Sequence, residues 1–104
     1  MKINFYFQQT DKTCEKQVNE YFTEEKLNRL TNLLHHGNLE LAILDVRIEY
    51  FSHHNDYVAK LNMTVGKREF IGEKRGFSLI ESLDIALDNL VSQLRKLESI
   101  RHDK

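Results

Sequence analysis

The sequence predicts an α+β fold: a two-layer sandwich of order β-α-β-β-β-α, in which a four-stranded mixed sheet carries both helices on one face. Four segments alternate apolar and polar residues, which is typical of half-buried strands. Two longer segments repeat apolar residues every three or four positions, which is typical of amphipathic helices. Because each strand has one apolar face, we expect both helices to cover that side of the sheet and to leave the other side open.

The first strand is predicted at Lys2–Phe7, where apolar and polar side chains alternate. The polar stretch Gln8–Thr13 follows and offers Thr10, Asp11 and Thr13 as N-caps of a helix. A helical segment after this stretch would carry the chain back along the sheet. We therefore expect the second strand to lie parallel to the first, through a right-handed crossover.

The first helical region is predicted to run to His36, but its apolar face shifts near Thr23. Thr23 is followed by two glutamates, which resembles a second helix start with acids in the first turn. One kinked helix or two short helices would both satisfy this pattern. We favour one long helical region with a defect near Thr23, ended by Gly37-Asn38 as a C-cap pair.

Three further strands are predicted, and the links between them are too short for anything but antiparallel pairing. The segments are Ala42–Phe51, a polar turn at Ser52–Asp56, Tyr57–Val65, a tight turn at Gly66-Lys67, and Arg68–Lys74, with Gly76 breaking the last strand. The expected sheet is thus one parallel pair extended by an antiparallel meander.

The last third of the chain is predicted to be a capped amphipathic helix. Ser78 and Glu81 form the S-x-x-E capping-box pattern, in which the Ser78 oxygen accepts a hydrogen bond from the N–H of position 81. Ile85, Val91 and Ile100 lie off the main apolar stripe and are candidates for contact with a partner. The stripe itself is made of leucines: Leu79, Leu83, Leu87, Leu90, Leu94 and Leu97.

The composition favours a single domain over residues 1–104, large enough to bury roughly two-thirds of the surface of its unfolded chain. The only cysteine is Cys14, so no intramolecular disulfide can form, which indicates a reducing compartment. The start lacks the apolar core of a signal peptide, and no apolar run approaches the ~20 residues of a membrane span. We expect a cytoplasmic protein with no metal or cofactor.

The residues that could catalyse a reaction or bind a metal lack the patterns that such sites need. Adjacent histidines, His35-His36 and His53-His54, point in different directions, and no cysteine or acid lies at a zinc-site spacing. Cys14, near a predicted helix start, could be a nucleophile. It falls on the apolar face, however, which favours a small buried side chain. We expect no enzyme activity.

The net charge is −1, with 15 Lys and Arg against 16 Asp and Glu, which argues mildly against a sequence-independent nucleic-acid binder. Because both helices pack on one side, basic residues from each could still form one phosphate-binding patch. A solvated surface of mixed charge explains the same residues. The basic residues in question are Lys26 and Arg29, Lys67-Arg68 and Lys74-Arg75 around the last strand, and Arg95-Lys96 on the last helix.

Several segments carry a resemblance to a known family: KINFYF at the start, KLNRL (Lys26–Leu30), DVRIEY, the hairpin AKLNMTVG (Ala59–Gly66) and SLDIALDNLVSQLRKL (Ser82–Leu97). On the strength of these segments, the chain resembles the ribosome hibernation promoting factor and ribosome-associated inhibitor family (sigma-54 modulation protein-like). The resemblance extends over nearly the whole length of the chain. The length matches the short form, which lacks the C-terminal dimerisation domain of long members. The family's fold is the same β-α-β-β-β-α sandwich.

The resemblance implies a stress or stationary-phase protein that binds the small ribosomal subunit, occupies the channel for messenger and transfer RNA, and inhibits translation. Family members hold ribosomal RNA through basic residues on the two helices. Where family helices often carry further Lys or Arg, this chain has Asn89, Val91 and Ser92. The residues to which an rRNA contact carries over are Lys26, Arg29, Arg95 and Lys96, and more weakly Lys74 and Arg75.

Two other classes of function remain open on sequence grounds. The first is an interaction module whose open sheet face or last helix mediates protein contact or homodimerisation without RNA. The second is a small enzyme, which would need a pocket with perturbed acids. The expected partners are the small ribosomal subunit and its rRNA, with no membrane, no small-molecule substrate, and a monomer or weak homodimer as the free state.

Overall fold

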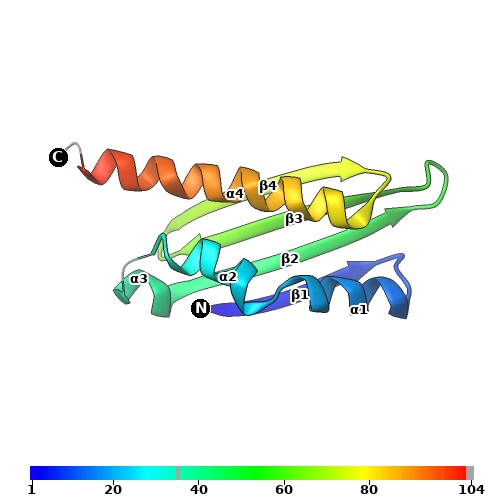
Figure 1. The fold of residues 1–104 in the computed structure, drawn as a ribbon, viewed down its shortest axis with the longest axis horizontal. Helices are drawn as coiled ribbons and strands as arrows, with labels where there is room; N and C mark the ends of the chain where they lie inside the picture. The colour runs from blue at the N-terminus through cyan, green and yellow to red at the C-terminus, as the bar shows by residue number, and fades with distance from the viewer. Residues whose placement is uncertain (35, 103–104) are drawn as a thin grey trace.

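A computed structural model describes residues 1–34 and 36–102 of the chain (Figure 1). The four predicted strands are confirmed: β2 matches its predicted bounds, and the others are one or two residues longer. In chain order the elements are β1 (Lys2–Gln8), α1 (Lys12–Tyr21), α2 (Glu24–Thr31), α3 (His36–Leu41), β2 (Ala42–Phe51), β3 (Asp56–Val65), β4 (Arg68–Gly76) and α4 (Leu79–His102).

The strands form one sheet in the order β1-β2-β3-β4. β1 lies parallel to β2, and the other two pairs are antiparallel, as predicted. The register aligns Phe5, Val46, Leu61 and Gly72 across the sheet, so the side that faces the helices is the apolar one. Figure 1 shows α1, α2 and α4 on this side. The predicted α+β sandwich, with its helices on one face, is therefore confirmed.

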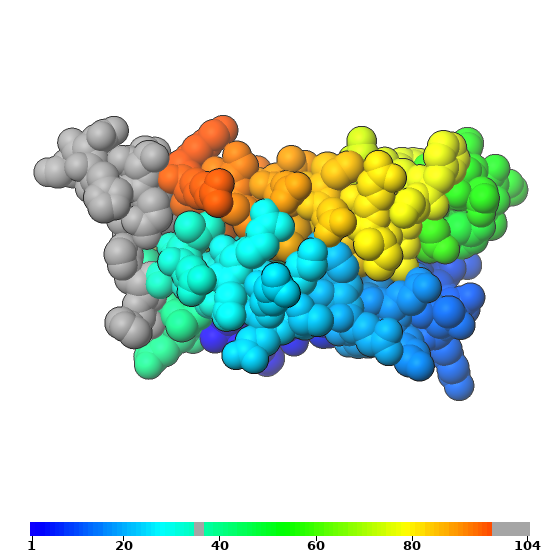
Figure 2. Space-filling model, in the orientation of Figure 1, coloured from blue at the N-terminus to red at the C-terminus, as the bar shows by residue number. Residues whose placement is uncertain are grey.

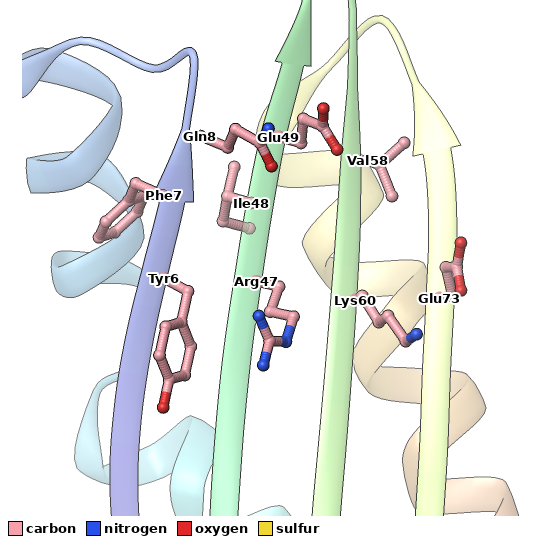
Figure 3. Close-up of a pocket in the computed structure, with 9 residues that line it drawn as sticks. All are labelled: Tyr6, Phe7, Gln8, Arg47, Ile48, Glu49, Val58, Lys60 and Glu73. Atoms are coloured by element: carbon pink, nitrogen blue, oxygen red, sulfur yellow. The ribbon is translucent and has the colours of Figure 1, made fainter.

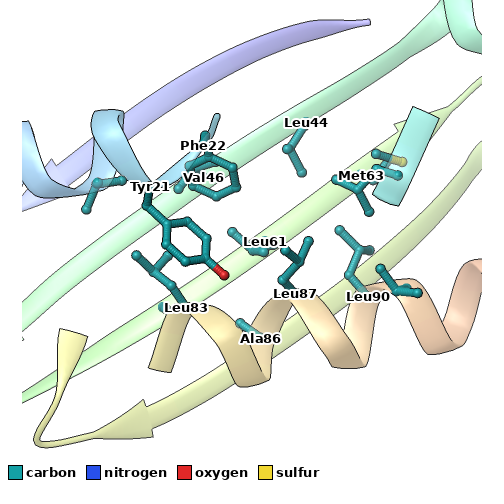
Figure 4. Close-up of a cluster of buried hydrophobic side chains, with 14 of the residues drawn as sticks. Tyr21, Phe22, Leu44, Val46, Leu61, Met63, Leu83, Ala86, Leu87 and Leu90 are labelled. Carbon is teal, nitrogen blue, oxygen red and sulfur yellow. The ribbon is translucent and has the colours of Figure 1, made fainter. Parts of the chain in front are cut away.

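The core lies between this side of the sheet and the helices. In Figure 4, Leu83, Leu87 and Leu90 of α4 lie against Leu61 and Met63 of β3. The leucine stripe is buried as predicted from Leu79 to Leu94, while Leu97 and Ile100 lie outside the side chains that the structure describes. The core comprises Cys14, Val18, Tyr21, Phe22, Leu30, Ala42, Leu44, Val46, Ile48, Ala59, Leu61, Met63, Val65, Leu79, Leu83, Ala86, Leu87, Leu90, Val91 and Leu94.

One apolar residue expected on the surface of α4 is part of this core. Val91 is only 3% exposed, so the prediction that it is available to a partner is wrong. The buried face of α4 is wider than a single leucine stripe, because Ala86 is also fully buried. Ile85 is half-buried and does not form a separate exposed apolar face.

The first helical region is two helices, so the favoured single helix with a defect is wrong and the alternative of two short helices is confirmed. α1 ends at Tyr21, and Thr23 caps α2 by accepting a hydrogen bond from the N–H of Lys26 (3.4 Å). Neighbouring residues in one helix point about 100° apart. The break instead lets both Tyr21 and Phe22 be buried, with Phe22 edge-on to Phe5 at 5.9 Å between ring centroids.

The region also ends differently from the prediction. α2 stops at Thr31, and the predicted C-cap pair Gly37-Asn38 lies inside the short helix α3. A glycine C-cap normally takes a left-handed backbone conformation. Gly66, in the β3–β4 turn, is the glycine with a positive φ (62°), whereas Gly37 takes an ordinary helical conformation. The pair therefore belongs to a helix that leads directly into β2.

α4 is fixed to β4 by close backbone approach and by side-chain hydrogen bonds. A Cβ atom on Gly72 would overlap the carbonyl oxygen of Ala86 and lie 2.7 Å from the N of Leu90. Gln93 bonds both backbone groups of Ile71, accepting from its N–H at 3.0 Å and donating to its C=O at 2.7 Å. Such bonds cover the outer edge of the sheet at β4, which would otherwise be free to pair with another strand.

The start of α4 forms the first of the two hydrogen bonds of the predicted capping box. The Ser78 Oγ accepts from the N–H of Glu81 at 3.3 Å, which satisfies one of the otherwise unpaired N–H groups of the first turn. Glu81 in this turn also suits the positive end of the helix dipole. The point at which α4 begins is thus marked by a local side-chain hydrogen bond.

Candidate nucleic-acid interface

The predicted rRNA contacts come from three elements. Lys26 and Arg29 lie on α2, Arg95 and Lys96 on α4, and Lys74 and Arg75 at the end of β4. Figure 2 shows that α2 (cyan) and α4 (yellow to orange) adjoin on one face of the molecule. The structure therefore brings the two helices together, as expected, and the surroundings of each cation decide whether it is available to a phosphate.

The cations of α2 face acids of α4. Lys26 Nζ lies 3.4 Å from an Asp84 carboxylate oxygen, and Arg29 Nη2 lies 2.7 Å from Asp88. The spacing of Asp84 and Asp88 alone is common on solvated helix faces. Here both acids lie on the face of α4 that adjoins α2, one opposite Lys26 and the other opposite Arg29. Both predicted contacts on α2 are therefore already paired within the chain.

Asp84 is the most engaged of these acids. The Tyr21 hydroxyl donates to it at 2.5 Å, and Lys26 lies 4.9 Å from the centre of the Tyr21 ring. The hydrogen bond from Tyr21, with a further contribution from Lys26, holds the pKa of the Asp84 carboxyl below its usual value. Burial and the hydrogen bond to Asp84 raise the pKa of Tyr21. Asp84 is consequently a carboxylate at neutral pH, and its negative charge stays beside Lys26.

Arg95 and Lys96 are in a different environment. Both are exposed, and neither forms an ion pair with any residue in the described part of the chain. The helix continues to His102, so they lie inside it rather than in its last turn. The favourable effect of a helix dipole on cations is confined to the last turn. Among the described residues, their availability therefore comes from the absence of an ion-paired acid and not from the helix end.

Lys74 and Arg75 lie on opposite sides of the sheet, because neighbouring strand residues alternate. Lys74 pairs in register with the buried Ala59, which places it on the helix side. Arg75 pairs with Val58 on the open side, where it donates to Asp56 at 2.5 and 3.3 Å and lies over the Phe51 ring. Its hydrogen bonds hold the pKa of Asp56 below its usual value. The structure thus separates Arg75 from the other predicted contacts.

Two further basic residues come from the end of the sheet towards which α4 runs. Arg68 opens β4 and pairs in register with the inward-facing Val65, which puts it on the helix side, and Lys67 precedes it in the turn. The bonds from α4 to β4 show that the helix runs back along this strand, so its C-terminal half reaches the end where β4 begins (Figure 1). Strand alternation and helix direction together could have identified this cluster, here called the end cluster: Lys67, Arg68, Arg95 and Lys96.

Among the described residues, the remaining candidates show no reactive site. Cys14 is 5% exposed, as the apolar-face interpretation predicts, and burial raises the pKa of its thiol, which disfavours the reactive thiolate. His53 and His54 are exposed in the β2–β3 turn, whereas His35 and the His36 side chain lie outside the described residues. Among the side chains that the structure describes, no group of three His, Cys, Asp or Glu could hold a metal ion. Within residues 1–34 and 36–102, no helix has both the length and the hydrophobicity needed to cross a bilayer.

The fold can be compared with that of known proteins. No protein-family profile and no curated protein matches the sequence. Several solved structures are similar, and two of them match over nearly the whole of both chains. One is a ribosomal subunit interface protein from Coxiella burnetii, with 12% identity over 95% of this chain and 99% of that one and a TM-score of 0.71. The other is the N-terminal domain of Protein Y from Thermus thermophilus, with 18% identity over 93% and 99% and a TM-score of 0.67.

These likenesses bear on the family resemblance noted in the sequence. At such low identity a structural match establishes the fold, not the function. Both neighbours agree with the family that the sequence resembles, and the β-α-β-β-β-α sandwich expected from it is confirmed. The chain has the fold of a ribosomal subunit interface protein and of the Protein Y N-terminal domain.

Proposed function

We propose that the chain is a non-enzymatic ribosome-binding factor of the cytoplasm. In this proposal it occupies the mRNA and tRNA channel of the small subunit, contacts rRNA, and inhibits translation under stress or in stationary phase. The observation that carries the proposal is the structural match to a ribosomal subunit interface protein, which covers 95% of this chain and 99% of that one. The family segments in the sequence support it independently.

The ion pairs of the described residues support a choice among the cations that could carry the proposed rRNA contact. Phosphate oxygens are bound by Lys and Arg side chains that no acid of the same chain neutralises. The end cluster meets this condition among the described residues, and Lys74 does as well. Lys26 and Arg29 would have to exchange Asp84 and Asp88 for phosphate, which lowers their net contribution. We therefore propose Arg95 and Lys96 as the main contacts, with Lys67 and Arg68 added to the predicted set.

The test is co-sedimentation of the purified chain with small ribosomal subunits at several salt concentrations. We expect binding at low salt. The logarithm of the binding constant should fall linearly with the logarithm of the salt concentration, because each neutralised phosphate releases counterions. Bound protein should also compete with mRNA and initiator tRNA and reduce translation in a purified system. Absence of sedimentation at low salt would remove the ribosome-binding proposal, and binding without competition would remove the channel.

The charge-reversed double variant Arg95→Glu with Lys96→Glu tests the site within this function. It should lose ribosome binding, whereas Lys12→Glu with Lys16→Glu on α1 makes the same change in net charge away from the end cluster and should bind much better. Unfolding curves of both variants check that the fold is kept. Equal losses in the two variants would show that net charge, and not this site, governs binding.

A second candidate function is a protein-interaction or homodimerisation module. One observation favours it: Phe77 is 79% exposed just before α4, and its neighbour Ile80 is 43% exposed. Exposed aromatic residues commonly anchor protein interfaces. A mass that rises with concentration and falls in Phe77→Ser, without RNA binding, would favour this module over the ribosome-binding factor.

A further inference from the structure

The open side of the sheet, away from the helices, carries a hollow that the proposed function does not use. Its volume is about 300 Å³, within the range of small-molecule sites. One cross-strand row runs through it, because the register aligns Tyr6 with Arg47, Arg47 with Lys60, and Lys60 with Glu73. Figure 3 shows these four side chains on neighbouring strands, with Arg47 beside Tyr6 and Lys60 reaching towards β4.

The centre of this row is a pair of like charges. Arg47 and Lys60 are directly opposite each other in the antiparallel pair of β2 and β3, an arrangement that destabilises a sheet. Neither forms an ion pair with another described residue. Glu73 lies opposite Lys60 on β4 without forming an ion pair with it. Two other acids are engaged elsewhere, since Asp45 accepts from the side chain of Asn4 at 3.0 Å and Glu69 from that of Asn62 at 2.8 Å. An anion between the two cations would remove their repulsion.

An aromatic ring lies next to one of these cations, Arg47. The Arg47 guanidinium lies 4.4 Å from the centre of the Tyr6 ring, and the Tyr6 side chain is 43% exposed. Guanidinium planes and aromatic rings are the surfaces on which nucleobases stack. Glu49 and Glu73 border the hollow and offer acceptors for hydroxyl or amino groups, but they also repel further negative charge. The site therefore suits one phosphate attached to a planar ring, and not a long run of phosphates.

We propose that this hollow binds a nucleotide, with the phosphate between Arg47 and Lys60 and the base stacked beside Tyr6. The nucleotide is either a free mononucleotide or one residue of a single-stranded RNA. The site is on the opposite side of the sheet from the end cluster, so it does not rest on the proposed ribosome contact. It is also separate from Arg75, whose guanidinium is engaged by Asp56 on the same side.

The test is titration of the isotopically labelled full chain with each of the four nucleoside 5′-monophosphates, followed by NMR. We expect saturable shifts confined to the middle of β1, β2 and β3. The matching nucleoside and inorganic phosphate alone should each bind more weakly. Arg47→Gln and Lys60→Gln should each weaken binding about tenfold, since each removes one charge-assisted contact. Lys2→Gln removes a charge from the same side outside the hollow and should change little.

Several outcomes would overturn the proposal: no saturable shifts, shifts confined to the helix side, or equal losses in Lys2→Gln and Lys60→Gln. A second readout does not depend on loss of all binding. Tyr6→Leu should keep the sheet folded but lose the preference for nucleotide over inorganic phosphate, which an unfolded variant could not show. A short single-stranded RNA distinguishes the sources. Tighter binding of the RNA than of the mononucleotide assigns the site to a strand, and equal binding assigns it to the free nucleotide. Reversal of Arg95 and Lys96 should leave mononucleotide binding unchanged, so the two proposals can fail separately.

Discussion

Two groups of cations on the helix side of the molecule differ in what lies opposite them. Lys26 and Arg29 on α2 face acids of α4, whereas the end cluster has no ion pair among the described residues. Both groups carry the same sign of charge and both reach solvent. The difference therefore comes from the neighbouring element. A basic residue on a surface helix can take a phosphate at little cost only if the adjoining element supplies no acid.

The largest expected effect tests this difference directly. Replacing Arg95 and Lys96 together by Gln should lower affinity for small subunits about a hundredfold, because two charge-assisted contacts are lost. The same replacement of Lys26 and Arg29 should lower it less than about threefold, since a salt bridge must be broken before either contact forms. Co-sedimentation at fixed salt measures both. Similar losses in the two double variants would mean that the pairs with Asp84 and Asp88 open on binding.

The second effect concerns the packing of α4, which places both groups. Gly72→Ala should lower the free energy of unfolding by about 2–3 kcal/mol, because the new methyl group overlaps the backbone of α4 at Ala86. Gly37→Ala is the matched control: no described atom lies within 4 Å of the position that its Cβ would take, and the change should be less than about 1 kcal/mol. Urea unfolding followed by circular dichroism compares them. A Gly72→Ala variant as stable as the control would show that α4 can shift away from β4 at little cost.

The third effect removes the acids instead of the cations. Asp84→Asn with Asp88→Asn should raise affinity for small subunits about fivefold and steepen the salt dependence by up to about 0.7 per freed cation. The control is Glu24→Gln with Glu25→Gln, which makes the same charge change at exposed positions of α2. A larger gain in the control would assign the effect to net charge. No gain in either would mean that α2 does not approach the RNA.

Most of this fold can be predicted from the sequence because each strand has a recognisable local pattern of apolar and polar residues. The alternation in β2 and β3 identifies the buried face residue by residue, and short links force the meander. The first helical region is harder to predict from the sequence. Helices of eight to ten residues contain few repeats of the apolar pattern, and the boundary between them depends on tertiary burial. Burial of both Tyr21 and Phe22 decides the break there, and no local pattern contains that information.

The candidate site is harder to predict than the fold for the same reason. The pairing of Arg29 with Asp88 joins residues far apart in the chain, so it depends on how α2 and α4 pack. The separation of Lys74 from Arg75, by contrast, follows from strand alternation once β4 extends to Gly76. The predicted strand ended at Lys74, and that boundary hid the alternation. Whether a cation is free to bind phosphate thus depends on tertiary packing. The side of the sheet on which it lies depends only on its position in the strand.

The smallest effect sharpens the contrast between Lys74 and its neighbour Arg75. Arg75→Gln should leave ribosome binding unchanged, because Arg75 is on the other side of the sheet and engaged with Asp56. It should instead alter the response to acid. Arg75 lowers the pKa of Asp56 in the folded state, so the pair stabilises the fold above the unfolded pKa of about 4 and loses its effect as pH falls through the lower folded value. Urea unfolding of wild type and variant should therefore differ near neutral pH and converge as Asp56 is protonated. A difference that stays constant with pH would assign the role of Arg75 to its packing on Phe51, since that contact does not depend on the carboxylate.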